Sequence, residues 1–174
     1  FYYKPRVDRE LLAQHADGLL VLSGCLNSEV SRMLSAGDAV RARETAGWYQ
    51  EVFGKDHYFM EVQAHGIDEQ ARVMAETLRI ASAIGAPVVG TNDSHYLEAG
   101  HGRAHEALLC IQTGTNLQDT NRFRFSTPEF YIKSAEEMAR VFAELPEACR
   151  NTLAVAERCN LTLVLGKPQL PDFE

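Results

Sequence analysis

Three short apolar runs in the first half of the chain are separated by longer segments in which apolar residues recur at a helical spacing. The runs cover residues 18–23, 58–62 and 87–91. Their length and the turn-forming residues that flank them are typical of buried strands. Strands that alternate with helices of this length favour βαβ units around a parallel sheet or barrel. The pattern therefore predicts an α/β fold.

Two helices are predicted between these strands. Asp38 can cap the first, which ends at Gly54 and turns one apolar face inward, made of Ala39, Ala42, Ala46, Tyr49 and Phe53. Asp68 can cap the second, which ends at Gly85 and turns inward Val73, Thr77, Ile80 and Ile84.

The rest of the chain is predicted to be mainly helical. A helical pattern fits residues 101–110, and residues 112–128 are polar and typical of a loop. Ser134 with Glu137 forms a capping box that opens a helix with Met138, Val141 and Phe142 inward. Pro146 suits the first turn of another helix, whose apolar stripe would contain Cys149, Leu153 and Ala156. We expect a domain over residues 1–160 and a linker over residues 161–174.

Composition narrows the classes of function. The 174 residues carry a net charge of -7, with 45% hydrophobic and 24% charged residues, which is typical of a globular domain. A surface that binds duplex DNA through its phosphates is basic, so we expect any contact with nucleic acid at a small site where metal ions offset the charge. There is no apolar run of membrane-spanning length. The four cysteines include no CxxC pair, which indicates no disulfide framework and favours a reducing cytoplasm.

Candidate chemistry follows the third predicted strand, where Asp93 and His95 occur. Alternate side chains of an extended segment share a face, so these two would point the same way. A carboxylate and an imidazole are suitable ligands for Zn, Mn or Fe. The alternative is an ordinary turn followed by a solvated histidine, and spacing alone favours that interpretation.

Two further candidates follow the other strands. Cys25 comes directly after the first, where a thiolate can bind zinc or act as a nucleophile, although a lone cysteine is more commonly a small buried side chain. His65 follows Glu61 and Gln63 and can contact a substrate phosphate or orient a metal-bound water. The alternative for His65 is a loop histidine whose hydrogen bonds are satisfied within the protein.

The other histidines and cysteines carry weaker signals. His101 and His105 are four residues apart, but Gly102 follows His101, so the HExxH zinc motif is absent and we expect a partly exposed pair. Cys110, Cys149 and Cys159 fall on predicted apolar faces, and we expect them in the core.

Five segments, in the same order along the chain, resemble the PHP (polymerase and histidinol phosphatase) domain of bacterial DNA polymerase III alpha subunits. They are FYYKPR at 1–6, LSGCL at 22–26, TNDSHY at 91–96, HEALLCIQTG at 105–114 and EFYIKS at 129–134. The resemblance implies a distorted seven-stranded βα barrel with a trinuclear metal centre at the C-terminal ends of its strands. Carried over residue by residue, it makes Cys25, Asp93 and His95 metal ligands and leaves His65 a candidate for a catalytic or substrate contact.

The resemblance also implies what lies outside this chain. The family's first His-x-His motif and its other early ligands would precede Phe1, and the polymerase palm would follow Glu174. We therefore expect the fragment alone to be inactive. In the complete domain we expect up to three divalent metal ions, Zn or Mn.

The function implied is that of a DNA-directed DNA polymerase in replication, with metal-dependent 3′–5′ exonuclease proofreading in the PHP domain. Its expected partners are the 3′ end of the primer strand, the rest of the alpha chain and other replicase subunits, in the cytoplasm and without a membrane. One alternative is a catalytically silent PHP domain that stabilises the polymerase or binds a proofreading partner. Another is a stand-alone PHP phosphoesterase that acts on a small phosphate ester.

Overall fold

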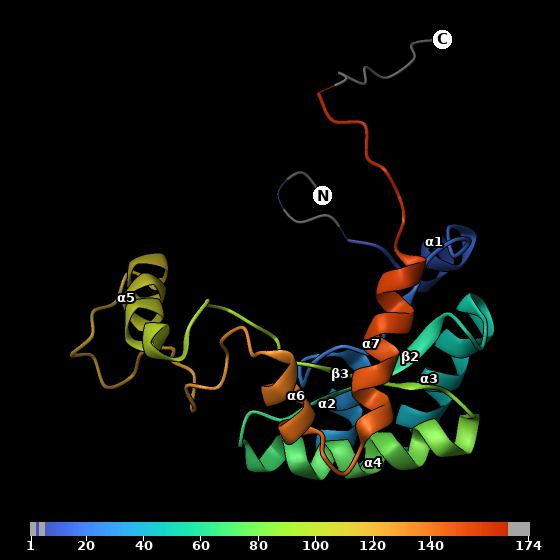
Figure 1. Cartoon of the computed structure of the whole chain (residues 1–174), viewed down its shortest axis with the longest axis horizontal. Helices are drawn as coiled ribbons and strands as arrows, with labels where there is room; N and C mark the ends of the chain where they lie inside the picture. Colours follow the sequence, from blue (N-terminus) through green and yellow to red (C-terminus); the bar gives the residue numbers. More distant parts are fainter. Residues whose placement is uncertain (1–2, 4–5, 167–174) are drawn as a thin grey trace.

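A parallel sheet forms the centre of the computed structural model, which describes residues 3 and 6–166 (Figure 1). Within these residues the sheet has three strands, β1 (Val21–Leu22), β2 (Tyr58–Gln63) and β3 (Val88–Thr91), in the order β1-β2-β3. Val21 pairs with Tyr58, and Met60 pairs with Val88. All three predicted strands are confirmed, although β1 is shorter than its apolar run. The parallel α/β architecture is confirmed as well.

Helices connect and cover the strands. Those in the first half are α1 (Arg9–Gln14), α2 (Glu29–Ser35), α3 (Ala39–Phe53) and α4 (Asp68–Ile84). Those in the second half are the 3-10 turn η1 (Ala99–His101), α5 (Gly102–Thr113), α6 (Ala135–Val141) and α7 (Pro146–Arg158). In the described residues after β3 the regular elements are therefore helices, but long loops separate them, so the second half is less helical than predicted.

Both predicted ends of α3 are correct, whereas the predicted start of α4 is one residue off. The Asp38 carboxylate accepts a hydrogen bond from the Arg41 backbone N–H at 3.1 Å, and Gly54 ends α3. Asp68 is not a cap as predicted, because α4 begins with Asp68 itself and Ile67 precedes it without a side-chain cap. In the first turn Asp68 still interacts favourably with the helix dipole. Ala39 is exposed rather than inward, since it is the first residue of α3.

The two faces of β2 have different roles. Tyr58, Met60 and Val62 are buried against α2, α3, α4 and α7 and form the centre of the core. The opposite face carries Phe59, then Glu61 and Gln63 toward the C-terminal end of the strand. The polar side chains are therefore concentrated where parallel α/β folds place their functional groups.

Helix α7 packs on β3, which joins the second half of the chain to the sheet. Ala148 is fully buried there, and the Asn151 side chain donates to the Val88 carbonyl at 2.7 Å. Of the predicted stripe, Cys149 packs against the core as expected, whereas Leu153 is 65% exposed and Ala156 is exposed. Cys159, also expected in the core, is exposed. The polar residue Asn151 faces β3 instead, and a pattern of apolar residues cannot predict this. Val141 also lies at the surface, whereas Met138 and Phe142 face inward as predicted.

Residues 97–130, named the arm below, leave the sheet after β3 and return to the same place. Figure 1 shows α5 at the far end of the arm, away from the sheet. At its base, Tyr96 pairs with Tyr131 in a parallel bridge, and the His95 N–H donates to the Phe130 carbonyl at 2.7 Å. Helix α5 ends at Thr113, and Gly114 follows it with a φ of 66°. The loop predicted for 112–128 is thus confirmed from its third residue onward.

The ends of the chain complete this description. Residues 160–166 form no helix or strand. Residues 167–174 of the predicted linker, and Phe1, Tyr2, Lys4 and Pro5 of the first family-like segment, lie outside the described residues. Among the described residues, no helix has both the length and the apolar character needed to cross a membrane.

Candidate functional site at the strand ends

The Glu61 carboxylate connects the C-terminal ends of the three strands. It accepts hydrogen bonds from the Gly24 backbone N–H at 3.0 Å, from the Gln63 side chain at 3.0 Å and from the Thr91 hydroxyl. The Glu61 N–H in turn donates to the Ser23 hydroxyl at 2.8 Å. These contacts fix the loop that carries Cys25 relative to the end of β3.

Cys25 lies in the loop after β1 and is half-buried. It lines a cavity of about 20 Å³ together with Glu61 and Gln63, which is room for about one water molecule. Gly24, with a φ of 83°, adopts a left-handed conformation that turns the chain at this point. A thiol and a carboxylate therefore border the same small space.

Asp93 and His95 are exposed just after β3, and Asp93 has a φ of 45°, in the left-handed region that Asp tolerates better than most side chains. The His95 Nδ1 lies 2.7 Å from the Asp93 carbonyl oxygen. That contact fits a tautomer in which Nδ1–H donates and Nε2 keeps its lone pair. No hydrogen bond to Nε2 is found among the described residues, so His95 presents a nitrogen of the kind that metal ions bind.

His65 is fully buried, and both of its ring nitrogens have partners. Nε2 donates to the Asn92 carbonyl at 2.6 Å, and Nδ1 accepts from the Gln70 side chain at 2.8 Å. Its ring stacks on Phe130, with centroids 4.2 Å apart. In this arrangement the ring offers no nitrogen to a substrate, so the geometry favours the satisfied loop histidine over the predicted substrate contact.

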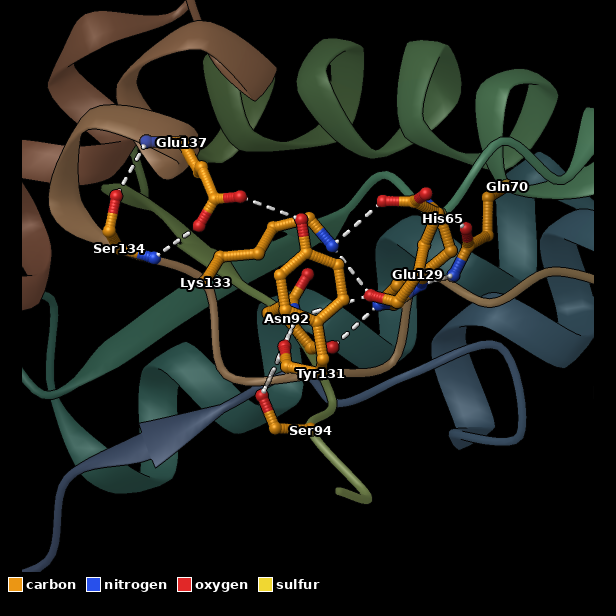
Figure 2. Close-up of polar contacts among 9 residues, drawn as sticks. All are labelled: His65, Gln70, Asn92, Ser94, Glu129, Tyr131, Lys133, Ser134 and Glu137. Atoms are coloured by element: carbon orange, nitrogen blue, oxygen red, sulfur yellow. Dashed lines mark hydrogen bonds and ion pairs between the residues drawn. The ribbon is translucent and has the colours of Figure 1, made fainter. Parts of the chain in front are cut away.

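A polar network holds the chain after β3 against the segment that enters α6. Figure 2 shows Tyr131 and Lys133 at its centre. Asn92 and Ser94 donate to the Tyr131 carbonyl, and the Tyr131 hydroxyl donates to Glu137 at 2.8 Å. The Lys133 side chain is 2% exposed and forms an ion pair with Glu129 at 3.0 Å.

Hydrogen bonds also set the electrostatics of this network. The Ser134 N–H, followed by the Tyr131 hydroxyl, lowers the pKa of Glu137, which forms the predicted capping box with Ser134. The same hydrogen bond to Glu137 raises the pKa of Tyr131. Glu137 is therefore held as a carboxylate at neutral pH, and the segment from 129 to 137 has a fixed path beside Asn92.

His95 also meets the arm. Its ring lies 5.6 Å from that of His105 and 4.7 Å from that of Phe125, measured between centroids. Burial, and then the charge of His95, lowers the pKa of His105. His105 is half-buried, whereas His101 is exposed near Glu98, so the two do not form a common site.

The structure does not bring the predicted ligands together into a complete metal site. Asp93 and His95 are adjacent at the end of β3, whereas Cys25 is at the end of β1, on the other side of β2. In the described part of the chain, no three His, Cys, Asp or Glu side chains gather as they would around one metal ion. The donors present are of suitable types, but they are an incomplete set.

Comparison with known proteins identifies the region. Residues 1–65 match the PHP domain family. The chain is 47% identical over 173 residues to the DNA polymerase III subunit alpha of Treponema pallidum, which covers 99% of this chain and 15% of the relative. It is 44% identical over 180 residues to that of Deinococcus radiodurans, covering 98% of this chain and 13% of the relative. Nearly the whole chain is thus similar to one segment of DNA polymerase III alpha subunits, and its first 65 residues match the PHP domain. The chain therefore spans only about one seventh of the length of these relatives.

Sequence reasoning missed two members of the PHP region's site. The sequence pattern places Glu61 on the same face as Gln63 and gives it no role, although a carboxylate in a mainly apolar central strand is a signal that it accepts buried hydrogen bonds. The sequence pairs His105 with His101 and places it in the family-like segment 105–114, but it gives His105 no contact with the strand ends. Its contact with His95 depends on the path of the arm, which no local pattern in the sequence reveals.

Proposed function

We propose that this PHP region is part of a replicative DNA-directed DNA polymerase and that the completed domain acts as a metal-dependent 3′–5′ exonuclease on primer ends. The observation that carries the proposal is the pair Asp93 and His95, which is exposed at a parallel strand end. Within the part of the chain that the structure describes, the His95 Nε2 has no hydrogen-bond partner. The similarity to polymerase alpha subunits over nearly the whole chain supports the wider context.

In this proposal the three-stranded sheet is part of a seven-stranded βα barrel, and residues 1–160 belong to one PHP domain. Cys25, Asp93 and His95 would hold divalent metal ions, Zn or Mn, together with ligands from the rest of the alpha chain. When bound, such ions lower the pKa of water and neutralise phosphate charge. The Asp93 carbonyl orients the His95 ring, and Glu61 positions the loop of Cys25.

The partners follow from the same proposal. The 3′ end of the primer strand would enter at the strand ends, the rest of the alpha chain would supply the other ligands and the polymerase site, and other replicase subunits would assemble around it in the cytoplasm. The net charge of -7 supports entry of a single strand end rather than broad contact with a duplex. The fragment alone would be inactive.

A second candidate is a catalytically silent PHP domain that stabilises the polymerase or binds a proofreading partner. It is favoured by the incomplete donor set in the described residues and by the internal hydrogen bonds of His65. In that case Cys25, Asp93 and His95 would contribute to folding or to metal-dependent stability alone.

The test uses the intact alpha subunit with its polymerase site disabled. We would measure degradation of a primer with a mispaired 3′ end in added Zn or Mn, and metal content in parallel, for the wild type, Asp93→Asn and the control Asp17→Asn. Asp17 is an exposed aspartate before β1. We expect Asp93→Asn to lose metal and at least tenfold in degradation rate, and Asp17→Asn to lose neither.

Two other outcomes decide against parts of the proposal. Unchanged metal content in Asp93→Asn would remove Asp93 from the ligand set. Bound metal in the wild type without any degradation would favour the silent domain, and activity on a phosphomonoester but not on DNA would favour the phosphoesterase.

A further inference from the structure

An aromatic row crosses the arm, from the loop after α5 to the end of β3. Phe123 lies in that loop, and its ring makes a T-shaped contact with the ring of Phe125, with centroids 5.7 Å apart. The Phe125 ring in turn lies 4.7 Å from that of His95 and 4.4 Å from that of Phe130. Two ring contacts therefore connect the loop of the arm to the pair Asp93 and His95.

The two ends of this row differ in their exposure to solvent. Phe123 is 60% exposed, whereas Phe125 is half-buried and Phe130 is 4% exposed. A single exposed apolar side chain is common on protein surfaces and needs no function of its own. Phe123 differs because the rings behind it lead to the candidate ligands and hold it at a fixed distance from them. Its accessible ring can therefore receive a planar partner beside the strand ends.

The charges of the arm favour an anionic partner. Each acidic side chain of the arm has a partner within the protein: Glu106 pairs with Arg122, Glu129 pairs with Lys133, Glu98 lies near His101, and Asp119 accepts from the Asn116 N–H.

Two arginine side chains beside the row are left without such a partner. Arg103 and Arg124 are both exposed, and among the described residues neither side chain makes an ion pair or a hydrogen bond. Arg103 lines the same cavity as Phe125, and Arg124 directly follows Phe123 in the chain. The unpaired charge near the row is therefore positive, although the whole chain is acidic.

An exposed ring beside unpaired arginines suits single-stranded nucleic acid better than a protein partner. Bases stack on aromatic rings whatever their identity, and cationic side chains follow the phosphate backbone. The centre of a protein interface is depleted of charged residues, whereas Phe123 stands between Arg122 and Arg124 in the chain. The row therefore points to a strand rather than to a second protein.

We propose that Phe123 is a stacking platform for a base of the single-stranded primer end, placed so that the terminal nucleotide reaches Asp93 and His95. The inference rests on the proposed function, because it adds a substrate contact to the same site. The base lies against the exposed ring of Phe123, and Phe125 keeps that ring at a fixed distance from His95. Arg103 and Arg124 offset the charge of the strand's phosphates, and Phe123 takes no part in the metal chemistry.

The first test is photocrosslinking to the intact alpha subunit in a metal chelator, so that binding is measured without metal-dependent degradation. The probe is a short single strand with 5-iododeoxyuridine near its 3′ end, and mass spectrometry locates the crosslinked residue. We expect a crosslink at Phe123 that Phe123→Tyr retains and that Phe123→Ala reduces at least tenfold. Ile111→Ala, at a 78% exposed position on α5, is the control for loss of an exposed apolar side chain from the same arm and should keep the crosslink.

The second test measures degradation by the metal-loaded alpha subunit with its polymerase site disabled. Two substrates are compared, a short single strand and the p-nitrophenyl ester of thymidine 5′-monophosphate, which has no preceding base to stack. Phe123→Ala should raise KM for the strand by about fivefold, with the effect in KM rather than in kcat. The ratio of kcat/KM between strand and ester should fall by a similar factor, and Phe123→Tyr should restore it.

The outcomes separate this inference from the proposed function. A crosslink at Phe123 without degradation by the wild type keeps the strand-binding site and rejects the nuclease. No crosslink in the loop, or an equal yield for the wild type and Phe123→Ala, overturns the inference whatever the nuclease does. An unchanged KM together with a lower Tm of the alpha subunit in Phe123→Ala also overturns it, and identifies the ring as a contact with another part of the polymerase.

Discussion

At the scale of single residues, Glu61 shows how one charged side chain in an apolar strand can organise a site. Its carboxylate accepts from the loop after β1, from its own strand and from the end of β3. Hydrogen bonds to a charged acceptor are stronger than neutral ones, and removing the acceptor leaves the donors unpaired. Glu61 therefore contributes to stability and also fixes the positions of the predicted ligands.

Replacing Glu61 with Ala should lower the free energy of unfolding by about 2–3 kcal/mol, because three donors lose their acceptor in a partly buried place. Glu51→Ala, at an exposed position on α3, should change it by less than about 0.5 kcal/mol. Urea denaturation of the 174-residue chain compares the two. Equal effects of the two substitutions would show that the Glu61 contacts add nothing to stability.

The sequence predicted residues at strand ends but not the environment of each one. Asp93 and His95 could be found because both follow an apolar run. The extended path that would put them on one face is not seen, since Asp93 has a left-handed φ of 45°. The burial of His65 could not be predicted, since its partners Asn92 and Phe130 are distant in the chain and reach it only after folding. Whether Cys25, Asp93 and His95 bind metal stays a prediction.

At the scale of elements, local signals were sufficient for most helices and all three strands. The caps Asp38 and Ser134 and the end at Gly85 depend on neighbouring backbone groups alone. The inward face of α7 depends instead on its contacts with β3. There the Asn151 side chain points inward because it donates to the Val88 carbonyl. Apolar periodicity therefore fails at an interface that uses a polar contact.

The packing of β3 leads to a prediction at Gly90. A Cβ atom there would lie 2.8 Å from Cε2 of Phe142, so Gly90→Ala should destabilise the chain by about 1–3 kcal/mol through overpacking. Gly47→Ala is the control, since nothing lies within 4 Å of its Cβ position inside α3, and it should stabilise by about 0.5–1 kcal/mol.

The cause is tested by adding Phe142→Leu to Gly90→Ala and measuring all variants by thermal and urea unfolding. The double variant should lose less than the sum of the two single losses, because the smaller side chain makes room for the new methyl group. Additive losses would mean that the Phe142 ring is not what Gly90 accommodates.

At the scale of the whole molecule, α7 is the main contact between the two halves of the chain. The alternation of strands and helices could be predicted from the sequence, because it follows from local periodicity. The docking of α7 on β3 and the direction of the arm could not, since each depends on contacts between distant segments. The seven-stranded barrel came from the family resemblance alone and stays a proposal.

This junction can be tested with the same substitution at two positions of α7. Ala148→Asp places an unpaired charge in a fully buried position and should cost more than about 3 kcal/mol, enough to detach α7 from the sheet. Leu153→Asp, at a position that is 65% exposed, should change stability by less than about 0.5 kcal/mol. Circular dichroism during urea unfolding compares them, and a large loss in Leu153→Asp would restore the stripe predicted from the sequence.

The closed base of the arm has a mechanical consequence. The bridge between Tyr96 and Tyr131, with the hydrogen bonds from the His95 N–H to the Phe130 carbonyl and from the Ile132 N–H to the Tyr96 carbonyl, joins the two points where the arm departs and returns. Tension applied along the backbone would pass from β3 to α6 across this junction. The arm, residues 97–130, would then carry no tension until the contacts at its base break.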